Sequence, residues 1–324
     1  MKEVELKMLE RAKALLESGE VARVVGWKKG EFCFDPAPAT FETVDELNDF
    51  VYNWFCGANL SKYLISVSKK EGKTAVFLKP CDTYSFNQLV KEHRIKRENV
   101  YVIAVECLAK LDIEKIKAQG VTGVTDVEVN DKEVKVTSLY GETVLNKPDV
   151  ILTKCETCEK THQVKDEEII LHERPERDVD RFAEVAKLEA MTEDERFAFW
   201  REQLSKCIRC NACRNVCPAC SCVKCVFDNP GSGIAAKAND SEFEEQMFHI
   251  IRAFHVAGRC TDCGECSRVC PQNIPLHLLN RKFIKDIDGL YGEYQAGEES
   301  EGKTPLTSYK EEDTEPNDVF KAEV

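Results

Sequence analysis

The sequence predicts two fold classes in one chain: an α/β domain in the N-terminal half, and a mainly helical domain with metal-binding cysteines near the C-terminal end. The first prediction follows from continuous apolar runs that alternate with helical patterns between residues 21 and 155, which is typical of a mixed sheet with covering helices. The second follows from two runs of four cysteines between residues 207 and 270, set among segments with a helical period.

Both cysteine runs read C-x2-C-x2-C-x3-C-P, the spacing of bacterial ferredoxins. Three thiolates two residues apart fit one cubane, whereas the fourth lies three residues further on and ligates the other cluster. The proline after each fourth cysteine cannot continue a helix. We therefore predict a bacterial-ferredoxin-like dicluster domain with two [4Fe-4S] clusters. Cluster 1 is bound by Cys207, Cys210, Cys213 and Cys270, and cluster 2 by Cys260, Cys263, Cys266 and Cys217.

Structural zinc is the alternative for these eight cysteines. Zinc sites usually use two C-x2-C pairs rather than two four-cysteine runs that each end in proline. A zinc scaffold would also give a colourless protein without labile sulfide.

The N-terminal elements follow from apolar spacing and from helix-start signals. Residues 2–17 should form a helix that stops at Gly19, and residues 21–35 should contain a short strand pair. The apolar face of this helix consists of Met8, Leu9, Ala12, Leu15 and Leu16. The capping box Thr43-Val-Asp-Glu46 should open a helix that runs through Phe55 and ends at Cys56-Gly57.

A β-α-β unit comes next. Residues 74–79 and 99–105 are continuous apolar runs, and the segment 83–93 between them has a helical pattern. Strands joined by a helix are expected to be parallel.

The second part of the α/β domain has weaker signals. We expect a short helix at 112–119 and a hairpin of 127–129 with 134–136 around Asn130-Asp131. Residues 150–153 resemble one more buried strand, and the charged segment 160–180 a linker or a surface excursion.

The cysteine-rich part should be helical between its loops. We expect helices at 180–190, after a capping box at Thr192-Glu-Asp-Glu195, and at 276–290. The insertion 218–259 contains a third capping box that begins at Ser241. Its helix carries an apolar stripe, which we expect to pack in the core, with a partner-facing surface as the alternative. The stripe consists of Phe243, Met247, Ile250, Ile251 and Phe254.

These signals divide the chain into segments. The divisions are an N-terminal helix with short strands (1–40), the α/β domain (41–178), the dicluster domain (179–292) and an acidic, irregular or disordered tail (293–324).

Five of the other cysteines each follow an expected strand or helix of the α/β domain. Loops at the carboxyl ends of parallel strands converge on one crevice, so these thiols could hold a third metal centre, iron–sulfur rather than zinc. Buried cysteines that only pack as small apolar groups are the alternative. The five are Cys56, Cys81, Cys107, Cys155 and Cys158.

Three more thiols, Cys220, Cys222 and Cys225, follow closely on Cys217 and could bind metal with a ligand from elsewhere, or simply lie near a cluster. Cys33 stands apart and is expected to be structural.

Composition excludes several classes of protein. An odd number of cysteines, 17 in 324 residues, does not fit a secreted disulfide scaffold and favours a reducing cytoplasm. The net charge of −13 argues against nucleic acid as a partner. The N-terminus resembles a charged helix rather than a signal segment, and no apolar stretch approaches the roughly 20 residues of a membrane span.

One motif is rejected on its context. Gly297–Thr304 matches the P-loop pattern, but no strand precedes it, Pro305 follows where a helix should begin, and glutamates would repel phosphate. We therefore expect no nucleotide site there.

Four stretches of the α/β part resemble a known family: Phe77-Leu-Lys-Pro-Cys81-Asp82, Asn87-Gln-Leu, Val102-Ile-Ala-Val-Glu-Cys107 and Lys154-Cys155-Glu-Thr-Cys158. They are similar to the beta subunits of deazaflavin-reducing hydrogenases and dehydrogenases, and to those of sulfhydrogenases and anaerobic sulfite reductases. The run from Cys207 to Cys225 resembles the dicluster domain of a branch linked to heterodisulfide-reductase-type and formate dehydrogenase complexes. The likeness covers about residues 40–320.

The resemblance implies an iron–sulfur electron-transfer subunit of an anaerobic, multi-subunit oxidoreductase, with other subunits as partners. The resemblance also implies that the five α/β cysteines act together at a third metal centre, although a cubane needs only four. Some relatives bind FAD and exchange hydride with a deazaflavin or a nicotinamide. A flavin-containing oxidoreductase subunit is therefore the alternative. In this chain Lys79-Pro80 replaces the family's glycine-containing loop, which argues against FAD.

Overall fold

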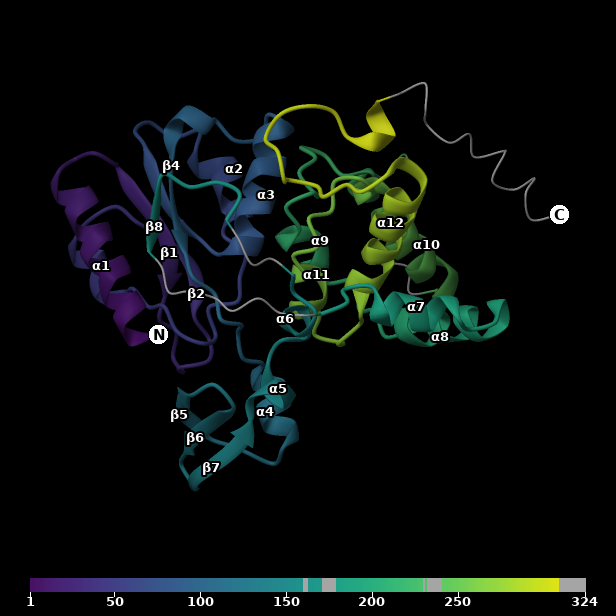
Figure 1. Cartoon of the computed structure of the whole chain (residues 1–324), viewed down its shortest axis with the longest axis horizontal. Helices are drawn as coiled ribbons and strands as arrows, with labels where there is room; N and C mark the ends of the chain where they lie inside the picture. Colours follow the sequence, from purple (N-terminus) through teal and green to yellow (C-terminus); the bar gives the residue numbers. More distant parts are fainter. Residues whose placement is uncertain (160–162, 171–178, 230, 232–240, 309–324) are drawn as a thin grey trace. The chain divides into compact units, whose positions relative to one another are not determined.

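The computed structural model describes residues 1–159, 163–170, 179–229, 231 and 241–308. They form two compact units (Figure 1). The first unit comprises residues 1–86 and 93–179, and the second comprises 87–92 with the chain from 180 onward. Each unit is described by itself.

A mostly parallel sheet forms the core of the first unit. Its strand order is β2-β1-β3-β4-β8, and only β2 is antiparallel to its neighbour. The predicted parallel pairing of the two apolar runs is confirmed by the register of β3 with β4. The strands are β1 (Arg23–Lys28), β2 (Ala37–Phe41), β3 (Thr74–Leu78), β4 (Val100–Val105) and β8 (Glu168–Ile170).

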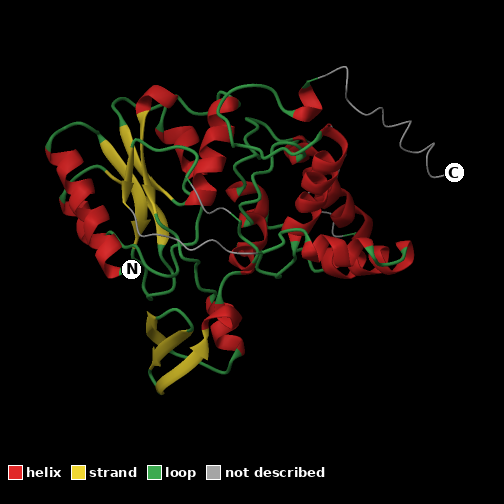
Figure 2. Ribbon diagram, viewed as in Figure 1, coloured by secondary structure: helices red, strands yellow, loops and turns green. Residues whose placement is uncertain are grey.

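Helices lie on both faces of this sheet (Figure 2). α1 (Lys2–Glu17) covers one face with its predicted apolar stripe, and α3 (Pro80–Lys91) lies on the other with α2 (Leu64–Val67). Every residue of β3 is buried, as a strand covered on both faces requires.

A small antiparallel sheet carries the rest of the first unit. The predicted hairpin is confirmed as β5 (Val124–Val129) with β6 (Glu133–Ser138), and β7 (Gly141–Asn146) extends it. The expected helix is α4 (Ile113–Ala118), which begins where the Asp112 side chain accepts a hydrogen bond from the Glu114 backbone N–H.

Four predictions in the first unit are wrong. The strand pair expected within residues 21–35 lies partly outside that range, because β2 begins only at Ala37. After the capping box at Thr43, only a 3-10 turn forms (Asp45–Asp49), because Phe50 is already extended. Residues 150–153 are not a strand: the chain has short helices at α5 (Lys147–Val150) and α6 (Thr153–Glu156), with one isolated bridge between Leu111 and Ile151. The expected linker contains β8, which pairs with β4, whereas residues 171–178 lie outside the described part.

Helices dominate the described residues of the second unit. They are α7 (Ala183–Glu189), α8 (Glu193–Ser205), α9 (Ala212–Val216), α10 (Glu242–Val256), α11 (Glu265–Arg268) and α12 (Leu276–Tyr291). Short 3-10 turns are found in this unit at Val226–Asp228 and Pro305–Thr307, and in the first unit at Ser61–Tyr63 and Arg97–Asn99. The predicted capping box of α8 is present, with both Thr192–Glu195 hydrogen bonds, and the Ser241 side chain caps α10.

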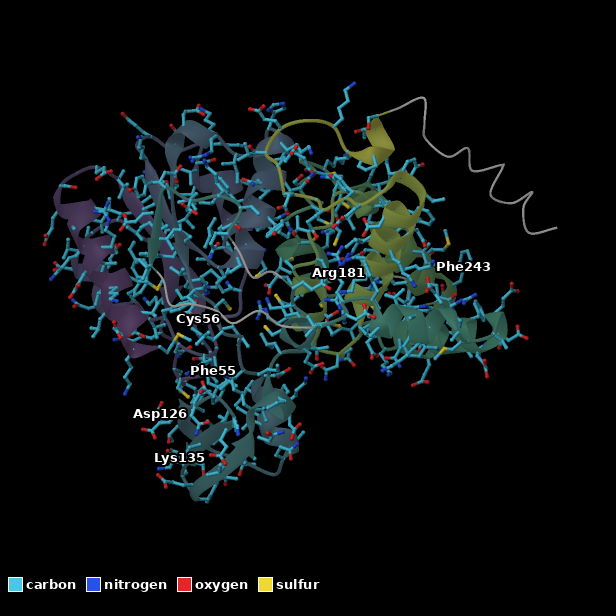
Figure 3. The ribbon with its side chains drawn as sticks, in the orientation of Figure 1. Phe55, Cys56, Asp126, Lys135, Arg181 and Phe243 are labelled. Carbon is cyan, nitrogen blue, oxygen red and sulfur yellow. The ribbon has the colours of Figure 1, made fainter. Side chains whose placement is uncertain are left out.

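The expected core stripe of α10 faces outward. Phe243 is 69% exposed and Phe254 61%, and Figure 3 shows Phe243 at the edge of the second unit. The buried face instead carries charge and aromatic groups: Glu245, Phe248, His249, Arg252, Ala253 and Val256. The prediction of apolar core packing is therefore wrong, because the polar side of this helix is the one that faces the cysteine loops.

The segment from Gly297 to Thr304 consists of turns and bends. Among the described residues, neither a strand before it nor an α-helix after it is present, as a P-loop would require. The remainder of the acidic tail, residues 309–324, lies outside the described residues.

Candidate metal centres

The four cysteines predicted for cluster 1 line one small cavity in the second unit, although they come from two runs more than fifty residues apart. The rest of the wall is largely apolar, with Ile208, Phe248, Ile274 and Leu276. Four thiols around an apolar cavity are the donor set that a cubane requires, since each iron takes one thiolate. The cavity lining includes Cys207, Cys210, Cys213 and Cys270.

The two cysteine loops have the same backbone conformation. In the first loop, Arg209 and Asn211 lie in the left-handed region, with φ of 52° and 61°. In the second, Asp262 and Gly264 occupy the same positions, with φ of 56° and 66°. Two left-handed residues per loop turn the chain tightly enough for successive cysteines to face one side, before α9 and α11 begin.

A buried ion pair holds each loop to a long helix. Arg209 Nε donates to Glu245 Oε1 of α10 at 3.0 Å, and Arg281 Nε of α12 donates to Asp262 Oδ1 at 2.8 Å. The loop residue is thus a cation in the first loop and an anion in the second. Because each of the four side chains is at most 6% exposed, each charge depends on its partner.

The cysteines predicted for cluster 2 also have close neighbours in the second unit. Cys217, Cys220 and Cys260 pack in one cluster with Val256, and the Asn280 amide donates to the Cys266 sulfur at 3.7 Å. A hydrogen bond from the Cys220 thiol lowers the pKa of Cys217 to about 6, with help from the charge of Arg252. Cys217 therefore favours the thiolate form in which cysteine binds metal.

Arg252 lies beside thiols of both predicted clusters. It is only 3% exposed. Burial alone would lower its pKa, but the charges of Cys266, Cys217 and Cys213 raise it above its ordinary value. A permanent cation among these sulfurs would offset part of the negative charge that bound clusters bring.

The five α/β cysteines are brought near one another in the first unit. Cys56, Cys107 and Cys155 are buried, and Figure 3 labels Cys56 beside Phe55. Burial raises the pKa of Cys155 to about 12, with a further contribution from Cys107, and the pKa of Cys81 rises through burial, Asp82 and Cys158. Cys155 and Cys81 therefore each have a second thiol as an electrostatic neighbour.

Sequence reasoning missed three lysines that accompany these thiols. Lys79 Nζ donates to Asp82 Oδ2 and to the Ala58 carbonyl, both at 2.6 Å. Lys110 Nζ donates to the Asn53 carbonyl at 2.8 Å and lies 3.9 Å from the centre of the Tyr52 ring. The signal was available, because each lysine stands within three residues of a candidate cysteine.

The third lysine, Lys154, donates to the Gly57 carbonyl at 2.8 Å. Lys110 is buried, Lys154 is partly buried, and the buried Lys79 is paired with Asp82. Ammonium groups in such a place are costly unless negative charge lies nearby. The α/β donor set therefore fits an anionic metal–thiolate centre.

The weaker candidates do not converge in this way. Cys220 contacts Cys217, Cys222 is exposed, and Cys225 contacts Arg214. All 17 cysteines lie in the described residues and none of them forms a disulfide.

One further set of donors appears beside cluster 1. Among the described residues, the group of at least three metal-binding side chains whose ligand atoms lie within 4.8 Å of one another is Cys207, Glu245 and His249. His249 belongs to no sequence motif, and it lies on α10 between the two cysteine runs.

A cavity of about 650 Å³ in the first unit has the size of a cofactor site. Its wall includes Glu3, Glu5, Asp126 and Glu128. These carboxylates would repel the diphosphate of FAD, so this cavity does not fit a flavin dinucleotide.

Comparison with known proteins agrees with the geometry of the loops. Residues 203–274 match the family model of the 4Fe-4S dicluster domain. A protein of Sinorhizobium fredii that is named as a ferredoxin is 34% identical over 79 residues, which covers 24% of this chain and 75% of the relative. The chain contains a ferredoxin-type 4Fe-4S dicluster domain.

Longer relatives align along both units. The chain is 23% identical to the F420-dependent formate dehydrogenase subunit beta of Methanocaldococcus jannaschii, over 86% of this chain and 88% of the relative. It is 27% identical to the F420-dependent formate dehydrogenase 1 subunit beta of Methanococcus maripaludis, over 85% and 87%. Over most of its length, the chain is therefore similar to the beta subunits that its sequence motifs resemble.

In this chain the dicluster domain follows the α/β unit along the sequence. In the parts that the structure describes, no helix is both long and apolar enough to cross a bilayer.

Proposed function

We propose that this beta subunit is the iron–sulfur electron-transfer component of a formate-dehydrogenase-type or hydrogenase-type oxidoreductase complex. The observation that carries the proposal is the convergence of four cysteines from two separate runs on one cavity. Bound clusters would each accept and release one electron. The chain's own residues bind the clusters, exclude water with apolar side chains and supply compensating charge.

Cluster 2 is assigned to the second run with Cys217, on the same spacing rule. The second unit is then a mainly helical, bacterial-ferredoxin-like domain. The proximity of Cys217 to Cys260 supports this exchange of the fourth ligand between runs.

A third centre in the α/β unit is part of the proposal. Five thiols with Lys79, Lys110 and Lys154 around them fit an anionic cluster better than a neutral core. Such a centre would give the electron a station between the dicluster domain and a donor or acceptor.

The partners are other subunits of the complex, because the relatives are named as subunits of formate dehydrogenases. Oxygen-labile clusters and cysteines without disulfides suit a reducing, cytoplasmic setting.

The test is iron and acid-labile sulfide per chain after strictly anaerobic purification. About eight of each means two cubanes and about twelve means three. Cys270→Ser should remove about four iron atoms, whereas Cys33→Ser, outside all proposed sets, should remove none. Fewer than about eight iron atoms in the unaltered chain, or bound zinc without sulfide, contradicts the proposal.

The flavin-containing alternative is tested on the same preparation. The names of the relatives include F420, which favours some site for hydride exchange. Flavin released on denaturation would establish this alternative, and its absence with about twelve iron atoms would favour the purely iron–sulfur route.

A further inference from the structure

His249 has no hydrogen-bond partner at a place where one is needed. It lies on the buried face of α10, is 2% exposed and lines the cavity of the cluster 1 cysteines. Neither Nδ1 nor Nε2 has a partner among the described residues. An imidazole buried without a hydrogen bond is costly, so a partner is expected inside the cavity.

The second buried histidine of this unit shows the contrast. His277 is 5% exposed, and its Nδ1 lies 2.8 Å from the Ser267 hydroxyl. The Nδ1 atom of His277 thus has a hydrogen-bond partner within the protein. The ligand atoms that lie close to the His249 imidazole are instead the sulfur of Cys207 and a carboxylate oxygen of Glu245.

Two neighbours fix where the imidazole can act. The ligand atoms of His249, Cys207 and Glu245 lie within 4.8 Å of one another. The carboxylate of Glu245 is already held by Arg209 at 3.0 Å. The imidazole therefore adjoins the sulfur side of the site, and the surrounding wall of Phe248, Ile274 and Leu276 is apolar and unsuited to water.

Ligation of iron by His249 is the weaker role for this imidazole. Four cysteines already line the cavity, one for each iron of a cubane. The role left for the ring is an N–H donor to sulfur. A donor aimed at a cluster sulfur stabilises the more negative, reduced state, because the acceptor gains charge on reduction.

We propose that His249 donates a hydrogen bond to a sulfur of cluster 1, either Cys207 Sγ or a cluster sulfide, and thereby raises the midpoint potential of that cluster alone. His249 is a positioning and tuning residue, not an iron ligand. The inference rests on the proposed function, since it requires cluster 1 in this cavity. The redox step adds one electron and moves no atom.

The experiment is a redox titration of the anaerobically purified full chain, followed by electron paramagnetic resonance. In His249→Leu, one of the two ferredoxin-type midpoint potentials should shift to a more negative value while the other stays unchanged. His249→Gln keeps an N–H donor and should restore part of the shift. His255→Leu, exposed on the same helix, should shift neither potential.

A second measurement detects the proposed hydrogen bond directly in the unaltered chain. Histidine labelled with ¹⁵N in the unaltered chain should give a weak hyperfine coupling to reduced cluster 1 in pulsed spectra, as a hydrogen-bonded imidazole does. The coupling should vanish in His249→Leu and persist in His255→Leu. A strong coupling typical of a ligated nitrogen, or none at all, overturns the proposal.

Iron content separates this inference from the proposed function. With about eight or more iron atoms in the unaltered chain but no shift in either potential for His249→Leu, only the role of His249 fails. With no clusters in the unaltered chain, the proposed function itself fails.

Discussion

At the scale of single residues, buried charged side chains lie next to the candidate metal-binding cysteines. Lys79 is 1% exposed and Asp82 is fully buried, and they form a pair at 2.6 Å beside Cys81. A buried pair of this kind is more costly to break than a surface pair, since the remaining charge has no compensation. At this scale the sequence was informative about the thiols, which carry a recognisable spacing, but not about their companions, which carry none.

Removing Lys79 should destabilise the first unit strongly. Lys79→Met leaves Asp82 buried without its cation, and we expect a loss of about 3–5 kcal/mol in the free energy of unfolding. Lys69→Met, at an exposed position, should change it by less than about 0.5 kcal/mol. The measurement is urea unfolding followed by the fluorescence of Trp27, which lies against Lys79. Equal effects of the two substitutions would disprove the structural role of the pair.

Single elements show why apolar pattern alone has limits. The helix predicted from Thr43 to Phe55 has both a capping box and a correct apolar spacing, yet the chain leaves the helical region at Phe50. Tertiary contacts decide this: Phe50 packs on Phe77 of the sheet, and its neighbour Val51 donates its N–H to the Trp27 carbonyl. The failed strand at 150–153 has a similar cause, because its apolar residues fill the core of the small sheet from short helices.

Helix α10 misled prediction for a different reason. Its apolar stripe has the period of a core face, but the core here is made of sulfur ligands and needs polar neighbours. No spacing rule distinguishes a helix that packs on apolar side chains from one that packs on metal-binding loops.

The orientation of α10 can be tested by two phenylalanines on opposite faces. Phe248→Ala removes a ring that is 1% exposed and packs on Phe227, so we expect a loss of about 3–5 kcal/mol. Phe243→Ala removes an exposed ring and should cost less than about 0.5 kcal/mol. Thermal unfolding of the iron-loaded chain measures both. A larger loss for Phe243→Ala than for Phe248→Ala would mean that the helix is turned the other way.

At the scale of the whole molecule, the two units differ in what stabilises them. The first is built on a sheet whose central strands are buried on both faces. The main core of the second includes four of the cysteines predicted to bind clusters, Cys207, Cys213, Cys266 and Cys270. The sequence predicted this division, because cysteine spacing and apolar runs are both local signals. The pairing of β8 with β4 was beyond it, since a three-residue strand is too short to show a period.

Iron removal should therefore affect the two units unequally. Treatment with a chelator and an oxidant should expose the chain from residue 180 onward to a protease, while β1, β3 and β4 stay protected. Mass spectrometry of the fragments gives the order of cleavage. Protection of the second unit after iron removal would contradict its dependence on clusters. Simultaneous cleavage in both units would contradict the expected difference between them.

The two buried ion pairs of the cysteine loops have a consequence for folding. Two loops of the same shape could each dock on either long helix, and a chain with such an internal repeat risks forming the wrong pair of contacts. With the loops exchanged, Arg209 would meet Arg281 and Asp262 would meet Glu245, like charge against like charge in a buried place. The opposite signs at equivalent positions thus distinguish two otherwise interchangeable loops, and only one arrangement of the repeat satisfies them both.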